Sequence, residues 1–166
     1  MRYLIIGAGP AGVVAAESLR RLDPTSDVAL ISDEPEPPYS RMAIPYLLIG
    51  RTEEEGTYLR KTGGYFEAQN IEIVQDQVTS VSTKKRSVAF RSGNHRGYDR
   101  LLVATGSSAI SPPIEGIDLP GVHSCWTLED ARAIAARAVP GSKVVLMGAG
   151  FIGCIILEAL ASRGVD

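Results

Sequence analysis

The sequence has little cysteine, histidine and tryptophan. Its 166 residues include two cysteines, Cys125 and Cys154, together with two histidines and one tryptophan. The two cysteines have neither the spacing of a metal site nor that of a redox pair, which argues against a disulfide framework and favours a reducing compartment. We therefore expect a cytoplasmic protein with ordinary thiols and no metal site.

An excess of charge of one sign is also absent. The formal net charge is -2, and the only compact basic run lies at residues 84–86. This excludes the electrostatic footprint of a protein that binds nucleic acid or an anionic membrane. The apolar stretch Val144–Leu157 is shorter than the roughly 20 residues that a bilayer-spanning helix needs. Glycines and Pro10 interrupt the N-terminal apolar run, so we interpret it as a turn and not as a secretory signal.

With 45% hydrophobic and 22% charged residues, the sequence has the composition of an ordinary globular protein with a hydrophobic core. "YLIIG" predicts a strand buried on both faces, and the apolar stripe after it predicts a helix over about Pro10–Arg21. "VALIS" then predicts a second buried strand. Together they form a strand-helix-strand unit with a right-handed parallel crossover.

The middle of the chain has a different pattern. Residues 34–50 are proline-rich and predict an ordered loop with a short helix near Tyr46–Ile49. "NIEIVQ", "QVTSVST" and "SVAFRS" are short and β-branched, with turn signals at residues 84–85 and 92–94, and they predict an antiparallel meander. "YDRLLVATG" predicts another buried strand that ends at a glycine.

The last third begins with a connector rich in proline and glycine, Ser107–Gly121. Thr127, with Asp130 three residues on, predicts a capped amphipathic helix, and "KVVLMGAGFIGCIILEALASRGVD" predicts a second strand, glycine turn and helix. We expect an α/β protein with a Rossmann-like domain, a parallel sheet with helices plus a β-meander, followed by the first unit of a second Rossmann-like domain. The predicted segments are residues 1–115, a connector with a helix at 116–141, and 142–166.

The first glycine turn predicts a dinucleotide site. Gly7 permits the tight turn, Gly9 allows a pyrophosphate to approach the backbone, and Gly12 allows the helix to pack close to the strand. The N–H groups of the helix start, which carries Pro10 and Ala11, attract phosphate charge. A carboxylate at the tip of the next strand is needed for the ribose, and both Asp33 and Glu34 are candidates, with Asp33 favoured.

The second glycine turn has the same spacing and predicts a second nucleotide site. Its residues are Gly148, Gly150, Phe151, Ile152 and Gly153. No tyrosine has a lysine four residues on, which argues against a short-chain dehydrogenase that uses the first turn for NAD.

The order of these motifs, with "LLVATGSSA", "SPPIEGIDLPGVHSCWTLEDA" and then the second glycine turn, resembles the FAD- and NAD(P)-dependent pyridine nucleotide-disulfide oxidoreductases over the whole chain. "PYSRMAIPY" is most similar to the ferredoxin-reductase, nitrite-reductase-flavoprotein and NADH-oxidase-like branches. The resemblance implies that the first turn binds FAD and the second binds NAD(P)H.

The resemblance also implies further FAD contacts outside the glycine turns. The matching positions are Arg41, Val78, Ala104, Thr105 and Gly106. Tyr46 stands where ferredoxin reductases often have a lysine, and we expect it to face the flavin ring. The alternatives are that Arg41 is a surface residue and that Tyr46 only packs.

Three departures from the family pattern concern the redox chemistry. Met42 stands where one branch has its cysteine, Ile155 stands where a glutamate is usual, and Trp126 stands where an arginine is common. These substitutions predict a flavin without an active-site cysteine and an altered nicotinamide environment.

The predicted function is that of the N-terminal part of a flavoprotein oxidoreductase. It passes a hydride from NAD(P)H to FAD and then electrons to a ferredoxin-like or rubredoxin-like acceptor. The alternatives are an NADH oxidase that uses oxygen and a non-catalytic nucleotide-binding module. We expect the 166-residue chain to be a fragment that is inactive by itself, from a parent expected to be homodimeric.

Overall fold

The computed structural model describes residues 1–166, which form two compact units. The first unit contains residues 1–39 and 58–106, and the second contains residues 40–57 and 107–166. Residues 40–57 therefore group with the C-terminal part of the chain. The segment boundaries expected from the sequence stay a prediction.

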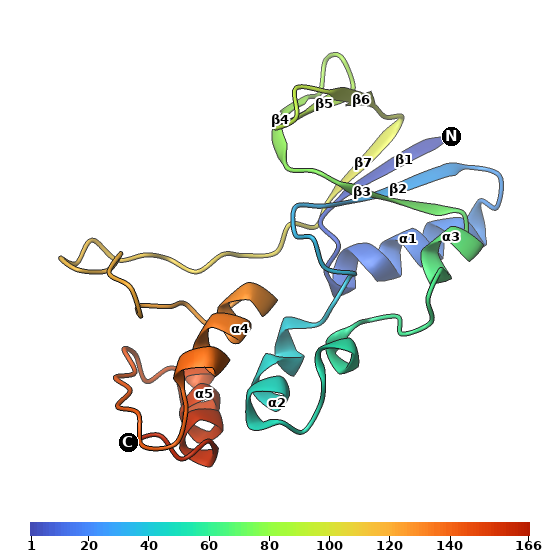
Figure 1. Cartoon of the computed structure of the whole chain (residues 1–166). Helices are drawn as coiled ribbons and strands as arrows, with labels where there is room; N and C mark the ends of the chain where they lie inside the picture. Colours follow the sequence, from blue (N-terminus) through green and yellow to red (C-terminus); the bar gives the residue numbers. More distant parts are fainter. The chain divides into compact units, whose positions relative to one another are not determined.

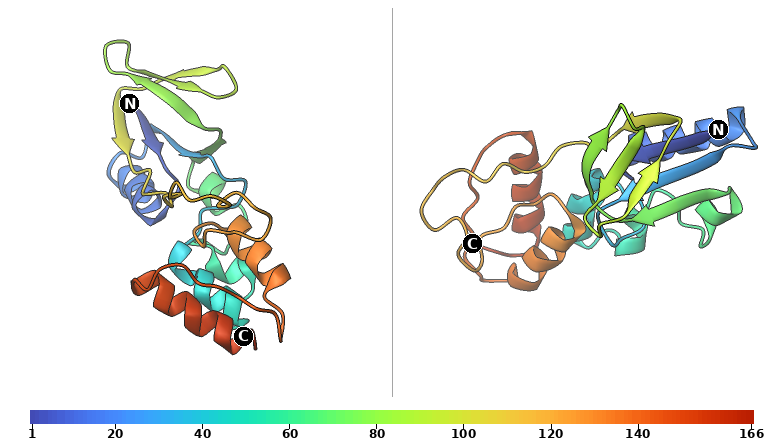
Figure 2. Two further views of the ribbon diagram at one scale, coloured as in Figure 1. Left: turned by 90° about the vertical axis from the view of Figure 1, so that its left-hand side faces the viewer. Right: turned by 90° about the horizontal axis from the view of Figure 1, so that it is seen from above.

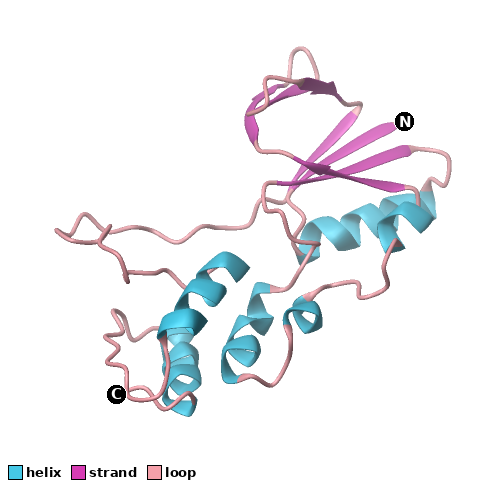
Figure 3. Cartoon of the chain, in the orientation of Figure 1, coloured by secondary structure: helices cyan, strands magenta, loops and turns pink.

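The first unit is built on a parallel sheet, drawn in magenta with the meander in Figure 3. Its strand order is β3-β2-β1-β7, with all three pairings parallel. The strands are β1 (Arg2–Ile6), β2 (Asp27–Ser32), β3 (Ile71–Gln75) and β7 (Arg100–Val103). Helix α1 (Pro10–Leu22) connects β1 to β2 and confirms the predicted crossover, while α3 (Tyr65–Ala68) has no counterpart among the predicted elements.

The sheet is covered on both faces, as Figure 1 shows. Ile5, Val28 and Leu30 face α1 and α3, where they pack with Val13 and Phe66. The alternate residues of the same strands pack on the other side against the meander; they are Leu4, Ile6, Ala29 and Ile31, with Val88, Phe90 and Tyr98 opposite. Burial of both faces explains why β1 and β2 are continuous apolar runs. The prediction of a buried strand in "YDRLLVATG" was wrong about burial, because Leu102 and Val103 of β7 are 41% and 60% exposed.

The antiparallel meander differs from the prediction in one strand. Its strands are β4 (Val78–Ser82), β5 (Ser87–Phe90) and β6 (His95–Gly97), whereas "NIEIVQ" forms β3, which pairs in parallel with β2. The assignment of that segment to the meander was therefore wrong. β3 is an edge strand in which Ile71 is buried but Glu72, Ile73 and Gln75 are exposed, and a short, largely exposed strand is also typical of an antiparallel meander.

The turns of the meander are where the sequence predicted them. Residues 83–86 join β4 to β5, with Arg86 at a φ of 48°, and residues around Gly93, at a φ of 89°, join β5 to β6. The third strand, β6, was not predicted, because it has only three residues.

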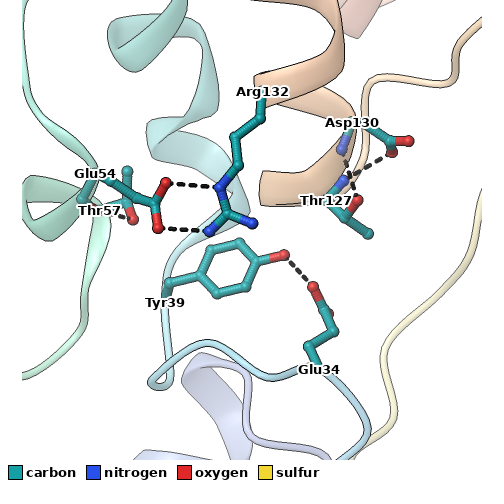
Figure 4. Close-up of polar contacts among 7 residues, drawn as sticks. All are labelled: Glu34, Tyr39, Glu54, Thr57, Thr127, Asp130 and Arg132. Carbon is teal, nitrogen blue, oxygen red and sulfur yellow. Dashed lines mark hydrogen bonds and ion pairs between the residues drawn. The ribbon is translucent and has the colours of Figure 1, made fainter.

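The second unit contains three helices of the chain, α2 (Ile44–Ile49), α4 (Leu128–Arg137) and α5 (Phe151–Ser162), with 3₁₀ turns η1 (Arg41–Ala43) and η2 (Glu54–Thr57). Helix α2 contacts both α4 and α5, and Figure 2 shows the group from two further sides. The Arg132 guanidinium binds both carboxylate oxygens of Glu54 at 2.8 and 2.5 Å, which ties α4 to η2 (Figure 4).

Helix α4 begins as predicted. Thr127 is its N-cap, and its hydroxyl accepts from the Asp130 N–H while the Asp130 carboxylate accepts from the Thr127 N–H (Figure 4). This capping box satisfies two backbone donors reciprocally.

The strand expected at residues 143–147 is not a paired strand in this chain. Backbone hydrogen bonds join only its start to the end of the chain: Gly141 N–H donates to Gly164 O at 2.7 Å, Asp166 N–H donates to Ser142 O at 2.8 Å, and Val144 N–H donates to Asp166 O at 2.8 Å. The last two bonds have the pattern of a parallel pair. In the first unit, Asp27 N–H likewise donates to Met1 O at 2.8 Å where β2 meets β1.

None of the helices combines the length and the apolar character that crossing a bilayer requires.

Candidate functional site

The carboxyl ends of the parallel strands bring distant parts of the first unit to one edge of the sheet. Gly7 N–H donates to Ile31 O at 2.9 Å, Ala104 N–H donates to Ile6 O at 2.8 Å, and Asp76 N–H donates to Ser32 O at 2.9 Å. The residues that follow β1, β2, β3 and β7 therefore meet at this edge. In open α/β sheets this is the edge where ligands bind.

Two of the three glycines in the first turn are required by close contact. A Cβ on Gly7, whose φ is +111°, would lie 2.2 Å from Ala104 O, and a Cβ on Gly12 would lie 1.9 Å from Gly7 O. Neither backbone oxygen can move aside without breaking the turn. The first contact joins the glycine turn to the end of β7, and the second lets α1 pack directly on β1.

Gly9 has a different environment. A Cβ there would meet no atom within 4 Å, and the φ of -74° suits any residue. The open space lies at the N-terminus of α1, where Gly9 is the N-cap, Pro10 begins the helix, and no side chain caps the N–H groups. The first turn of α1 also has no acidic residue, whereas α4 begins with a side-chain cap and two acidic residues. The start of α1 is therefore suited to an anionic ligand.

The two candidate ribose acids have different partners. Asp33 is exposed directly after β2. Glu34 is half-buried, and its carboxylate accepts a hydrogen bond of 2.5 Å from the hydroxyl of the buried Tyr39 (Figure 4). The exposed carboxylate is the one able to reach a ligand without losing an internal partner.

The other residues of the first unit that were predicted to contact FAD follow the carboxyl ends of β3 and β7 in the sequence. Val78 is the first residue of β4; it pairs with Phe90 and packs partly buried against the core between the two sheets. Ala104, Thr105 and Gly106 follow β7 directly, and Gly106 has a φ of +67°.

The second glycine turn repeats the geometry of the first. Gly148 has a φ of +107°, a Cβ on Gly153 would lie 2.5 Å from Gly148 O, and Gly150 has open space within 4 Å. Gly150 is the N-cap of α5, again without a side-chain cap or an acidic first turn. Phe151 and Ile152 are 75% and 50% exposed. Both turns therefore share the left-handed first glycine and the close packing at the third, whereas the contact of Gly7 with Ala104 O has no counterpart at Gly148.

Arg41 and Tyr46 belong to the second unit. Tyr46 lies on α2 with 53% of its surface exposed. The Arg41 guanidinium carbon lies 5.2 Å from the centre of the Trp126 ring, and its Nη1 donates to Ser107 O at 3.1 Å. The sequence marked Trp126 only as a departure from the usual arginine, and the contact with Arg41 across 85 positions was missed, since no local pattern indicates it.

Both cysteines of the chain are free thiols, and they do not form a disulfide with each other. Cys125 is half-buried, and burial raises the pKa of its thiol to about 11. Because only the thiolate is a good nucleophile, burial disfavours the reactive form of this thiol. Cys154 is exposed on α5.

Comparison with known proteins agrees with this geometry. The chain is 36% identical to an NADH oxidase of Methanocaldococcus jannaschii, with 100% of this chain and 39% of that protein covered. It is 32% identical to a rubredoxin-NAD(+) reductase of Pseudomonas putida, with 99% and 43% covered. The chain thus spans about two fifths of the length of these relatives.

Among solved structures, the ferredoxin reductase for a cytochrome system of Rhodopseudomonas palustris superposes with a TM-score of 0.91 at 30% identity, over 99% of this chain and 41% of that one. The family model that describes the pyridine nucleotide-disulphide oxidoreductases matches residues 1–166. Two glycine turns of one geometry, a parallel sheet with a meander and a match over the full chain lead to one conclusion: the chain belongs to the pyridine nucleotide-disulphide oxidoreductase family.

Proposed function

We propose that this chain provides the FAD-binding segment and the first part of the NAD(P)H-binding segment of a flavoprotein reductase. The observation that carries the proposal is the pair of matched glycine turns, each with open space over its middle glycine, Gly9 and Gly150. A single turn is common to many nucleotide-binding proteins. Two in one chain fit an enzyme that holds two dinucleotides.

Residues of the first unit are suited to FAD. The uncapped start of α1 would hold the pyrophosphate, and the exposed Asp33 would accept hydrogen bonds from the ribose. Val78 and Ala104–Gly106 would contact the cofactor from the neighbouring strand ends, whereas the FAD contacts expected of Arg41 and Tyr46 stay a prediction. When bound, the flavin supplies hydride acceptance and single-electron release.

Residues of the second unit are suited to NAD(P)H. The start of α5, with Gly148, Gly150 and Gly153, would hold its pyrophosphate. Ile155, two residues after Gly153, brings no carboxylate to the helix start, so the chain's own contribution there is backbone N–H groups and an apolar surface.

The proposed acceptor is a ferredoxin-like or rubredoxin-like protein. Relatives named as a ferredoxin reductase and a rubredoxin-NAD(+) reductase support this class. Met42 and the raised pKa of the Cys125 thiol support direct electron transfer without a cysteine intermediate. A second candidate is an NADH oxidase that reduces oxygen, which the relative from Methanocaldococcus jannaschii favours.

Anaerobic stopped-flow reduction of the full-length protein tests the proposal. We expect flavin absorption bands that NADH or NADPH bleaches and that a ferredoxin, a rubredoxin or oxygen restores; the fastest acceptor identifies the physiological class. A colourless protein that takes up no FAD would instead support a non-catalytic nucleotide-binding module.

Two matched variants separate the two sites. Gly9→Ala is expected to lower FAD content, because the methyl group fills the space over the first turn. Gly150→Ala is expected to leave FAD content unchanged and to slow reduction by the nicotinamide nucleotide, while reduction by dithionite stays normal. Both backbones accept alanine, since φ is -74° and -75° and no atom lies within 4 Å.

A further inference from the structure

The strand order of the first unit indicates where the base of a bound dinucleotide would lie. The uncapped start of α1 follows β1, and the exposed Asp33 follows β2. A dinucleotide with its pyrophosphate at α1 and its ribose at Asp33 therefore runs from β1 towards β2. The next strand in the order β3-β2-β1-β7 is β3. The adenine base would thus reach the residues that follow β3, Asp76–Val78.

The main chain of Val78 faces the open edge of the meander. Val78 pairs with Phe90. The neighbouring hydrogen bond runs from the Arg91 N–H to Gln77 O at 2.8 Å, which makes this a non-hydrogen-bonded pair whose N–H and C=O groups point away from the partner strand. β4 is an edge strand, in the order β4-β5-β6. Val78 therefore presents one donor and one acceptor side by side, which match the N1 acceptor and the N6 donor of adenine.

Asp76 fixes the segment that leads into Val78. Its N–H donates to Ser32 O at 2.9 Å, and its carboxylate accepts from the Gln77 N–H at 2.8 Å and from the Ser92 hydroxyl at 2.5 Å. The hydrogen bond from Ser92 is the main cause that lowers the pKa of the Asp76 carboxyl, so this group is ionised at neutral pH. One residue thereby links the end of β2, the start of β4 and the β5–β6 turn.

A fixed main chain is suited to recognition of a base. Hydrogen bonds weaken steeply away from a good distance and angle, so main-chain groups discriminate between bases only when they are held in place. A segment that is ordered before binding also loses less conformational entropy when the ligand binds. The Asp76 carboxylate supplies this order through charge-assisted hydrogen bonds, which are roughly twice as strong as those between neutral groups.

We propose that Asp76 is a positioning residue that holds Val78 for the adenine base of the flavin dinucleotide, with Ser92 as its partner. The inference rests on the proposed function, because it assumes that the first glycine turn binds FAD. All of these residues belong to the first unit. The inference predicts that loss of the Asp76 carboxylate lowers the selectivity for adenine as well as the affinity for FAD.

Selectivity for the base is measured on the full-length protein. Apoprotein is titrated with FAD and with the FAD analogue in which hypoxanthine replaces adenine, and flavin fluorescence gives both dissociation constants. Hypoxanthine reverses the donor and the acceptor of this edge of adenine, so we expect the wild-type protein to prefer FAD about tenfold, as for one or two hydrogen bonds. Asp76→Ala should weaken FAD binding and reduce this preference to about twofold.

A double-mutant cycle and two further variants separate positioning from a general effect. Ser92→Ala should lower the preference for FAD in the wild-type background but change it little in the Asp76→Ala background. Asp76→Asn keeps an acceptor for the Gln77 N–H and should retain part of the preference. Ser80→Ala removes an exposed hydroxyl from β4 and should leave both dissociation constants unchanged. Thermal unfolding of each apoprotein shows whether it is folded, and Ser92→Ala and Asp76→Asn serve if Asp76→Ala is not.

An unchanged preference in the Asp76→Ala variant, or no preference in the wild-type protein, would overturn the inference while leaving the flavoprotein assignment in place. Absence of FAD binding in the wild-type protein would overturn the proposed function and the inference with it.

Discussion

Asp33 and Glu34 show how one step along the chain changes the chemistry of a carboxylate. Both follow β2, but Glu34 is engaged by the buried Tyr39 hydroxyl at 2.5 Å, whereas Asp33 is exposed. The first contact stabilises the fold, and the exposed group is available to a ligand. We therefore expect replacement of the carboxylate by an amide of the same shape to have different effects at Asp33 and at Glu34.

Asp33→Asn should weaken FAD binding about tenfold or more, because hydrogen bonds to a charged group contribute about 1.5–3 kcal/mol. Glu34→Gln should leave the affinity nearly unchanged and lower the melting temperature. FAD titration of the apoprotein and thermal unfolding measure the two effects. The reverse pattern would make Glu34 the ribose acid.

Glu17 on α1 forms an ion pair with Arg60 in the first unit. Both of its oxygens accept from Arg60 at 2.6 Å, and Tyr65 donates to it at 3.1 Å. The hydrogen bond from Arg60 is the main cause that lowers the pKa of the Glu17 carboxyl in the folded state. The side chains of Glu17 and Arg60 are 22% and 32% exposed, so the pair is only partly screened by water.

A lowered folded-state pKa means that this stabilisation is complete above the unfolded value, about 4.3 for glutamate, and is lost as pH falls through the folded value. Glu17→Gln should therefore be about 1 kcal/mol less stable than wild type near pH 7, and the difference should vanish in more acidic solution. Urea unfolding at a series of pH values measures it. Glu67→Gln, at an exposed position on α3, is the control and should show no such trend.

At the scale of elements, one side chain ties the helices of the second unit together. The Arg163 guanidinium, just after α5, donates to Ala135 O and Ala138 O at the end of α4 and to Leu48 O on α2, each at 2.8 Å. A cation at these carbonyls also suits the negative end of the α4 dipole. These hydrogen bonds therefore stabilise the packing of helices that are too short to form a long apolar interface.

Arg163→Met should destabilise the second unit by about 2–3 kcal/mol, since several carbonyls lose a charged donor at once. Arg163→Lys should recover only part of this, because an ammonium group cannot reach all three oxygens in the fork geometry of a guanidinium. Urea unfolding followed by circular dichroism compares them. Lys143→Met, which removes an exposed charge nearby in sequence, should have little effect; an equal loss there would contradict the assignment.

At the scale of the whole molecule, the second unit exposes an apolar strip around the second glycine turn. Val145 is 95% exposed, Phe151 75%, Met147 64% and Leu157 55%. Of these, Val145 and Met147 line a groove of about 820 Å³ that Trp126 also lines. Apolar strips of this kind promote association.

The 166-residue polypeptide, prepared by itself, should therefore self-associate with increasing concentration. Val145→Lys should reduce the association, as measured by sedimentation velocity. Thr83→Lys, which adds the same charge at the exposed β4–β5 turn, is the matched control and should not. A monomeric wild-type polypeptide at high concentration would contradict this prediction.

The sequence by itself determined the local features of this protein: both glycine turns, α1, the capping box of α4 and the pairing of β1 with β2. The capping box and the contact of Gly12 with Gly7 lie within a few residues of chain, and a single helix joins β1 to β2, so residue type and order are enough to specify these features. The sequence could not assign β3 to the parallel sheet, because a short, largely exposed edge strand has the same kind of sequence as a meander strand.

Only the tertiary structure decided which residues of distant segments meet. It placed the ends of β1, β2, β3 and β7 on one edge, engaged Glu34 with Tyr39 so that Asp33 is the exposed acid, and stacked Arg41 on Trp126. These outcomes depend on strand register and on packing between segments up to 98 positions apart, the separation of Ile6 and Ala104. Local sequence patterns carry no information about such contacts, because the contacts arise from the common core and not from neighbouring residues.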